Sequence, residues 1–216
     1  TDIAGNPNAV NTNSAQTIDT VAPAKTTNLA VAFTDSGTSN SDRITNDNTM
    51  DFSGTATANF IAGETVRIYD GPTLLTTVTP TVGGTAWSVT GIAVTNGTHT
   101  FTARVADAAG NETAASAATT AVTVDTVAPT VTVTDNVPGT AILSTGTVAY
   151  TYTFSEPVTG LVASDFTVTN GTVSSVSGSG TTWTVNVTPT TNIASGNITL
   201  VMQSGAVQDT AGNLSA

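Results

Sequence analysis

Cysteine and basic residues are the most informative shortages in this sequence of 216 residues. Without cysteine no disulfide can stabilise the fold, and the redox compartment is left open. Only four residues are lysine or arginine, none of them follows Arg104, and the net charge is −11. Because a nucleic-acid surface must neutralise phosphates with basic side chains, we expect no nucleic-acid partner. The acidic excess leaves two interpretations open, solubility and the binding of a divalent cation.

Long apolar runs and aromatic residues are also scarce. No hydrophobic run approaches the roughly 18 residues that a membrane span requires, so we expect no membrane insertion by this segment. Aromatic residues make up 5% of the chain, and both tryptophans, Trp87 and Trp183, fit inward-facing strand positions. A carbohydrate-binding module would need an exposed aromatic platform, and the sequence offers none. Carbohydrate binding is therefore kept only as an alternative to the two functions developed below.

Catalytic combinations are missing as well. The single histidine, His99, lies on the same face of an expected strand as Phe101, which is typical of a strand-end residue near the core. One such histidine cannot supply a Ser-His-Asp set, and no cysteine nucleophile exists. No phosphate-binding glycine loop precedes a helix. We therefore expect a protein that is not an enzyme.

What the chain does contain is threonine, valine and repetition. Threonine and valine favour β-strands, and an Asp-x-Ala-Gly-Asn turn occurs at 2–6, 107–111 and 209–213. A Val/Ile-Asp-Thr-Val-Ala-Pro junction follows at 18–23 and 124–129. Successive copies lie 105 and 102 residues apart for the turn and 106 for the junction. A fixed period of this length predicts tandem immunoglobulin-like Greek-key sandwiches in an extended all-β array.

The repeats divide the chain into three parts. Residues 1–20 correspond to the last turn and last strand of a preceding or neighbouring domain. Residues 21–126 form a complete domain, and 127–216 form a second domain that lacks its last strand. Alternation of apolar and polar residues predicts the strands. In the first domain they are 28–34, 50–55, 65–69, 74–79, 86–92, 98–106 and 118–124. In the second they are 130–134, 147–154, 166–170, 172–177, 182–188 and 197–203.

The paired turn and junction motifs resemble those of bacterial Ig-like repeats in giant surface adhesins, including biofilm-associated proteins and RTX-type adhesins. Residues 17–126 are similar to the common subtype. Tyr-Thr-Phe-Ser-Glu-Pro-Val within 150–158 and Asp-Phe-Thr-Val-Thr-Asn-Gly at 165–171 resemble a second subtype. The resemblance implies an extracellular stalk of stacked sandwiches on a bacterial cell surface. It also implies calcium at the junctions and no catalysis; the ligand of such an adhesin stays unknown.

Strand order gives an independent reason to expect calcium. In an Ig sandwich the F–G loop lies at the same end as the start of strand A, so each acidic turn faces the aspartate of the incoming junction. The B–C loop shares that end. Carboxylate and amide oxygens are ligands that Ca²⁺ uses. The expected ligands are Asp19, Glu64, Asp107 and Asn111 at the first junction, and Asp125, Glu156, Asp209 and Asn213 at the second. The alternative is that Asp107 and Asp209 only cap their own turns and that Asp19 and Asp125 are solvated.

The last strand that the second domain is expected to lack suggests a second kind of interaction, between copies of the chain. An unpaired sandwich edge invites another strand. Residues 7–19 of one copy could therefore complete the second domain of the next copy by strand addition. The side chains expected to enter that domain are Ala9, Val10, Ala15 and Ile18. In this interpretation the chain is the subunit of an extracellular head-to-tail filament. The alternative is that the given sequence begins and ends within a repeat and that the edge is simply open.

Overall fold

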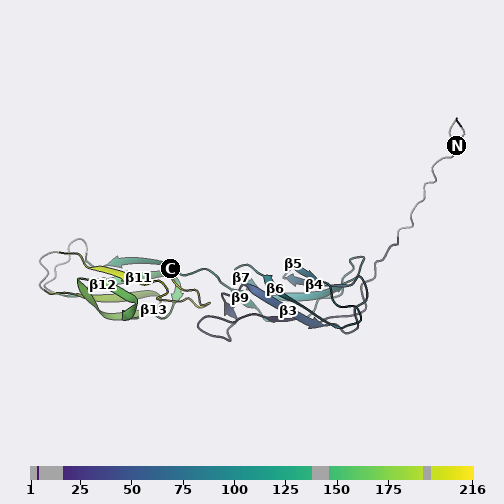
Figure 1. Ribbon diagram of the computed structural model, residues 1–216, viewed down its shortest axis with the longest axis horizontal. Coiled ribbons are helices and arrows are strands. Elements are labelled where there is room, and N and C mark those ends of the chain that lie inside the picture. Colours follow the sequence, from purple (N-terminus) through teal and green to yellow (C-terminus); the bar gives the residue numbers. More distant parts are fainter. Residues whose placement is uncertain (1–3, 5–16, 138–145, 192–195) are drawn as a thin grey trace.

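The computed structural model describes residue 4 and residues 17–137, 146–191 and 196–216. Two β-sandwiches follow one another along the long axis of the molecule, joined by a short linker (Figure 1). The only helical element in the described residues is a single 3-10 turn, η1 (Ala163–Asp165). In this part of the chain no helix is long and apolar enough to cross a membrane.

The first sandwich is built from three small sheets. One has the order β1-β3-β6, the second β5-β4-β8, and the third β2-β9-β7. The pairs are antiparallel except for β2 and β9, which run parallel. The strands are β1 (Ala30–Ala32), β2 (Ile44–Thr45), β3 (Thr49–Thr55), β4 (Thr65–Asp70), β5 (Thr73–Val78), β6 (Ala86–Ala93), β7 (Gly97–His99), β8 (Phe101–Ala106) and β9 (Val122–Val124).

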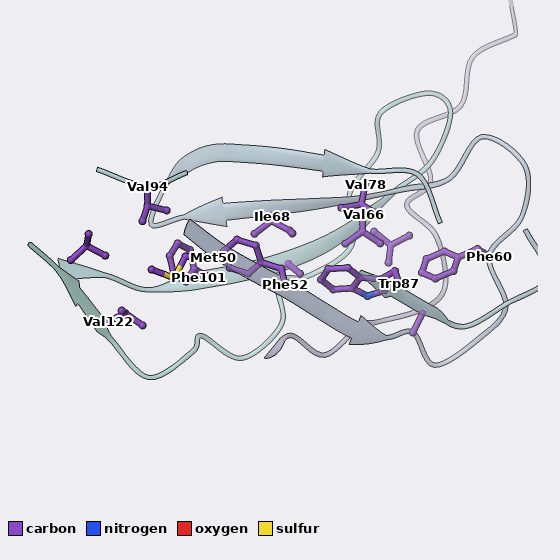
Figure 2. Packing of buried hydrophobic residues seen from close by; sticks show 14 residues of the cluster. Met50, Phe52, Phe60, Val66, Ile68, Val78, Trp87, Val94, Phe101 and Val122 are labelled. Carbon is purple, nitrogen blue, oxygen red and sulfur yellow. The ribbon is translucent and has the colours of Figure 1, made fainter. Parts of the chain in front are cut away.

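Alternation along the strands produces the core of the first domain. In β3, Met50 and Phe52 are buried while the residues between and beside them face outward, as the two-residue period of a strand requires. Phe101 on β8 meets Phe52 edge-on, with 4.9 Å between the ring centroids. Figure 2 shows these side chains in one continuous layer with Trp87.

Trp87 needs a glycine beneath it. A Cβ on Gly54 would lie 2.6 Å from the indole ring, so only glycine lets the ring lie against β3. The indole Nε1 donates a hydrogen bond of 2.7 Å to the buried Thr27 hydroxyl. The inward position expected for Trp87 is confirmed.

The second sandwich has fewer pairings. One sheet has the order β10-β11-β13 and the other contains β12 and β14. Tyr152 on β11 packs edge-on against Phe166 on β12, with ring centroids 5.4 Å apart. Trp183 is partly buried and packs against this core. The strands are β10 (Val131–Asp135), β11 (Val148–Val158), β12 (Phe166–Thr169), β13 (Gly171–Pro189) and β14 (Thr199–Met202).

The all-β fold and the tandem arrangement are confirmed, but some strands differ from expectation. The two expected strands at 172–177 and 182–188 lie within the single element β13. The expected strand at 118–124 shrinks to β9, because residues 113–119 follow β8 through spaced hydrogen bonds, such as Ser116 N to Ala103 O at 2.8 Å. β2 was missed, since two residues are too short to show a period.

Candidate functional site at the domain junctions

Each acidic turn is closed by its own aspartate. In the second domain Asp209 Oδ1 accepts hydrogen bonds from the backbone of Gly212 (2.7 Å) and Asn213 (2.9 Å), and Oδ2 accepts one from the Asn213 amide. In the first domain Asp107 Oδ1 accepts from Asn111 N at 2.8 Å and Oδ2 from Asn111 Nδ2 at 2.9 Å. These bonds lower the pKa of Asp107. The capping role considered for both aspartates is therefore present.

The asparagine of each turn holds the incoming linker. Asn111 Nδ2 donates to the carbonyl of Asp19 (3.2 Å), and Asn213 Nδ2 donates to that of Asp125 (2.8 Å). Each linker aspartate in turn accepts the backbone N–H two residues later, at 3.0 Å in the first linker and 2.9 Å in the second. The repeated sequence thus forms the same contact at both junctions. In each linker aspartate only Oδ1 accepts the backbone N–H two residues later, and Oδ2 takes no part in that hydrogen bond.

Three carboxylates meet at the second junction. One oxygen each from Asp125, Glu156 and Asp209 lie within 4.8 Å of one another. Burial raises the pKa of Glu156, and the facing charges of Asp209 and Asp125 raise it further. Within the described part of the chain none of the three forms a salt bridge with a basic residue. Among the described residues their negative charge is therefore not neutralised by a basic side chain.

Glu156 reaches this group in an unexpected way. It belongs to β11 and not to a B–C loop. The pairing of β11 with β13 is irregular between Thr153 and Val158. Such irregularities bend a strand and redirect its side chains, and this one lies at the end of the sandwich that faces the linker.

At the first junction the described residues form no equivalent group. Glu64 is 5% exposed; its Oε2 lies 2.7 Å from Lys25 Nζ and also accepts the backbone N–H of Ile61. No group of three such side chains includes Asp19, Glu64 or Asp107 in the described residues. The structure thus pairs Glu64 with Lys25 and does not group it with Asp19 and Asp107, so this geometry does not support the prediction that Glu64 is a calcium ligand.

A second interdomain contact involves no carboxylate. The loop after β1 reaches the acidic turn of the second domain: Ser36 Oγ donates to the Ala211 carbonyl (2.7 Å), and Thr38 N donates to the Thr210 carbonyl (3.2 Å). Gly37 lies between them against Gly212. The sequence analysis did not identify this contact, since residues 35–38 (Asp-Ser-Gly-Thr) show only the composition of a turn.

Of the residues expected in strand donation, Ala9, Val10 and Ala15 lie outside the described residues. Ile18 is described and is 84% exposed. On the possible acceptor side, β14 pairs in register with β12 alone among the described strands. Ser215 N donates to Val207 O in the same way as Thr113 N donates to Val105 O in the first domain.

His99 has a structural environment. It is 7% exposed and stacks on Phe101. Its ring nitrogens lie 2.6 Å from an Asp70 carboxylate oxygen and 2.7 Å from the Thr95 carbonyl. Both nitrogens are thus engaged within the fold, at the end of β7, where the sequence placed this residue.

Comparisons with known proteins agree with the geometry. A family model described as a bacterial Ig-like domain matches residues 22–126, and a second, different model with the same description matches residues 125–216. A search of curated proteins finds no match. The matched boundaries fall at the linker that carries Asp125. Since the two matches together span nearly the whole chain, the protein belongs to the bacterial Ig-like domains and carries two of them in tandem.

Proposed function

We propose that this chain is a non-enzymatic spacer of a bacterial cell-surface adhesin and that calcium stiffens its interdomain junction. The observation that carries the proposal is the group of Asp125, Glu156 and Asp209, whose oxygens lie within 4.8 Å of one another. These residues come from the linker, from β11 and from the acidic turn. A cation that binds all three ties the linker to two separate parts of the second domain.

The donor set fits calcium. Ca²⁺ takes six to eight oxygen ligands at roughly 2.3–2.6 Å from carboxylates, carbonyls and water. Three carboxylates that have no basic partner within the described ranges supply the charge, and the Asn213 side chain holds the linker beside them. Sites of modest charge in extracellular modules bind calcium at about 10⁻⁴ to 10⁻³ M. Such an affinity suits a protein outside the cell.

The mechanical consequence follows from electrostatics. Without a cation, the three carboxylates repel one another and favour separation of the linker from the second domain. A bound cation removes that repulsion and adds contacts across the junction. The first domain is already joined to the linker, since Thr126 donates to the Asn96 side chain through both its N–H (3.2 Å) and its hydroxyl (2.9 Å). Fixing the linker on the second domain therefore restricts the angle between the two sandwiches.

Small-angle X-ray scattering during a calcium titration tests this proposal. Calcium should narrow the distribution of interdomain distances in the native chain, and the Asp125→Ala variant should lose that response. Asp19→Ala is a matched control, because Asp19 makes the same local bond to its linker but lies in no three-carboxylate group. The proposal would be contradicted if calcium left the distance distribution of the native chain unchanged. It would also be contradicted if calcium still narrowed that of the Asp125→Ala variant.

One edge of β14 has no partner among the described strands, and this favours one second candidate, a filament subunit. Residues 7–19 of another copy would add a strand along this edge and build head-to-tail chains of molecules. Growth of long rods with protein concentration, measured by scattering in the absence of calcium, would support this function. Removal of residues 7–19 should then abolish the rods, and a monomer at all concentrations would argue against it.

A further inference from the structure

We infer that the exposed face of the turn from Asp107 to Asn111 is a docking surface for the Ser-Gly-Thr loop of an Ig-like domain that directly precedes the first domain. The partner it fits is a loop that presents a serine hydroxyl, a glycine and the next backbone N–H. The contact contains no carboxylate, so the inference does not depend on calcium.

The first support is the contact that the chain already makes. At the second junction the loop of the first domain offers two donors, the Ser36 hydroxyl and the Thr38 N–H, to two successive carbonyls of the acidic turn, at 2.7 and 3.2 Å. Gly37 lies so close that a Cβ on it would be 2.0 Å from the Thr210 carbonyl oxygen. The receiving groups are backbone carbonyls, so the turn's conformation, and not its side chains, forms the surface.

The second support is that the first domain repeats this conformation. Gly110 and Gly212 both have positive φ, 92° and 97°. Asp107 N donates to Asn111 O at 3.1 Å, and Asp209 N donates to Asn213 O at the same distance. The carbonyls of Ala108 and Ala109 therefore occupy the positions that Thr210 and Ala211 occupy in the second domain.

The third support is a difference in exposure. Ala211 is 1% exposed and its neighbours in the turn are partly covered. The equivalent Ala108, Ala109 and Gly110 are all exposed in the part of the chain that the structure describes. The same turn is thus covered by a preceding domain at one junction and uncovered at the other. The occupant that fits the exposed turn is a domain that presents a loop like residues 36–38.

The test extends the full chain with a second copy of residues 21–126 placed directly before residue 21. In that protein the linker at Asp125 of the added copy stands where Asp19 stands now. All measurements are made in a chelator, so that calcium plays no part. Scattering reports interdomain flexibility, and hydrogen exchange of the segmentally labelled added copy reports the amide of its Thr38.

Gly110→Ala is the informative substitution, and Gly212→Ala is its matched control. Both impose alanine on nearly the same positive φ, so their local strain is equal. A Cβ on Gly212 would meet Gly37 at 2.9 Å, whereas a Cβ on Gly110 has open space up to Arg67 at 4.0 Å. In the present chain only Gly212→Ala should loosen an interdomain contact. In the extended chain Gly110→Ala should loosen the new one.

Docking predicts that exchange of the Thr38 amide in the added copy is slow and becomes roughly tenfold faster with Gly110→Ala, as the loss of about two hydrogen bonds implies. Ser36→Ala in the added copy provides a second variant that leaves the turn itself unchanged and should also speed exchange. Fast exchange in the unsubstituted extended chain, or no response to either variant, would overturn the inference. A junction that is flexible in chelator and stiff in calcium would overturn docking while sparing the calcium proposal.

Discussion

The sharpest prediction concerns Glu156→Gln, which should stabilise the second domain without calcium and should remove most of the further stabilisation that calcium gives. In the chelated protein the substitution removes one of three mutually repelling charges. Two charges at the upper limit of this spacing, 4.8 Å, repel by about 1 kcal/mol in water and by about 3.5 kcal/mol at an effective dielectric constant of 20. Glu156 faces two such partners but is partly exposed and screened by salt. We therefore expect the second domain to gain about 1–3 kcal/mol of unfolding free energy.

Calcium offsets this advantage of the variant. A site with a dissociation constant of about 10⁻⁴ to 10⁻³ M stabilises the native domain by about 1.4–2.7 kcal/mol at about 10 mM calcium. For a domain of this size that energy raises the melting temperature by about 5–20 °C. Glu156→Gln removes a charged ligand, so most of this calcium-dependent increase should disappear.

The pH dependence provides an internal check. The pKa of Glu156 is raised in the folded protein, so its ionisation destabilises the fold. This loss of unfolding free energy is absent below about pH 4.5, the pKa of Glu156 in the unfolded chain, and is complete above its pKa in the folded protein. The advantage of the glutamine variant over the native chain in chelator should therefore appear as the pH rises above about 4.5 and persist at neutral pH.

Differential scanning calorimetry with and without calcium measures both effects. Asp51→Asn is the control: it removes one exposed charge in the first domain and keeps an acceptor for Gly91 N, now at 2.8 Å from Asp51 Oδ1. Its response to calcium should equal that of the native chain. A Glu156→Gln variant that is destabilised in chelator, or that keeps the full calcium response, would refute the reasoning.

Two further predictions concern the first domain. Lys25→Met leaves Glu64 buried without its partner and should lower the free energy of unfolding, measured by urea titration, by about 3–5 kcal/mol. Adding Glu64→Gln to Lys25→Met should recover part of this loss. A Lys25→Met variant as stable as the native chain would contradict the assigned ion pair. Burial raises the pKa of Glu112, but hydrogen bonds from Tyr69 and Arg67 outweigh it and lower the pKa overall. Glu112→Gln should therefore lower the free energy of unfolding by about 1–2 kcal/mol at pH 7. This difference from the native chain should shrink as the pH falls below about 4.5. Urea titrations across this pH range measure it, and a difference that stays constant would contradict the assignment.

The sequence alone determined the features that depend on neighbouring residues. Alternation fixed most strands, because side chains on a strand point to opposite faces. The acidic turns also follow from local sequence: the aspartate, the glycine with positive φ and the asparagine of each copy bond within four residues. For this reason the repeated motif predicted the repeated geometry at both junctions.

Only the tertiary structure decided which junction gathers charge. Glu64 and Glu156 were equivalent candidates in sequence, but Lys25, 39 residues from Glu64, neutralises the first, and an irregular strand brings the second to Asp125 and Asp209. The contact between Ser36 and Ala211 joins residues 175 positions apart. Such contacts depend on how the two folded domains pack against each other. Local sequence patterns do not predict this packing, because the groups that form the contacts belong to no common strand or turn.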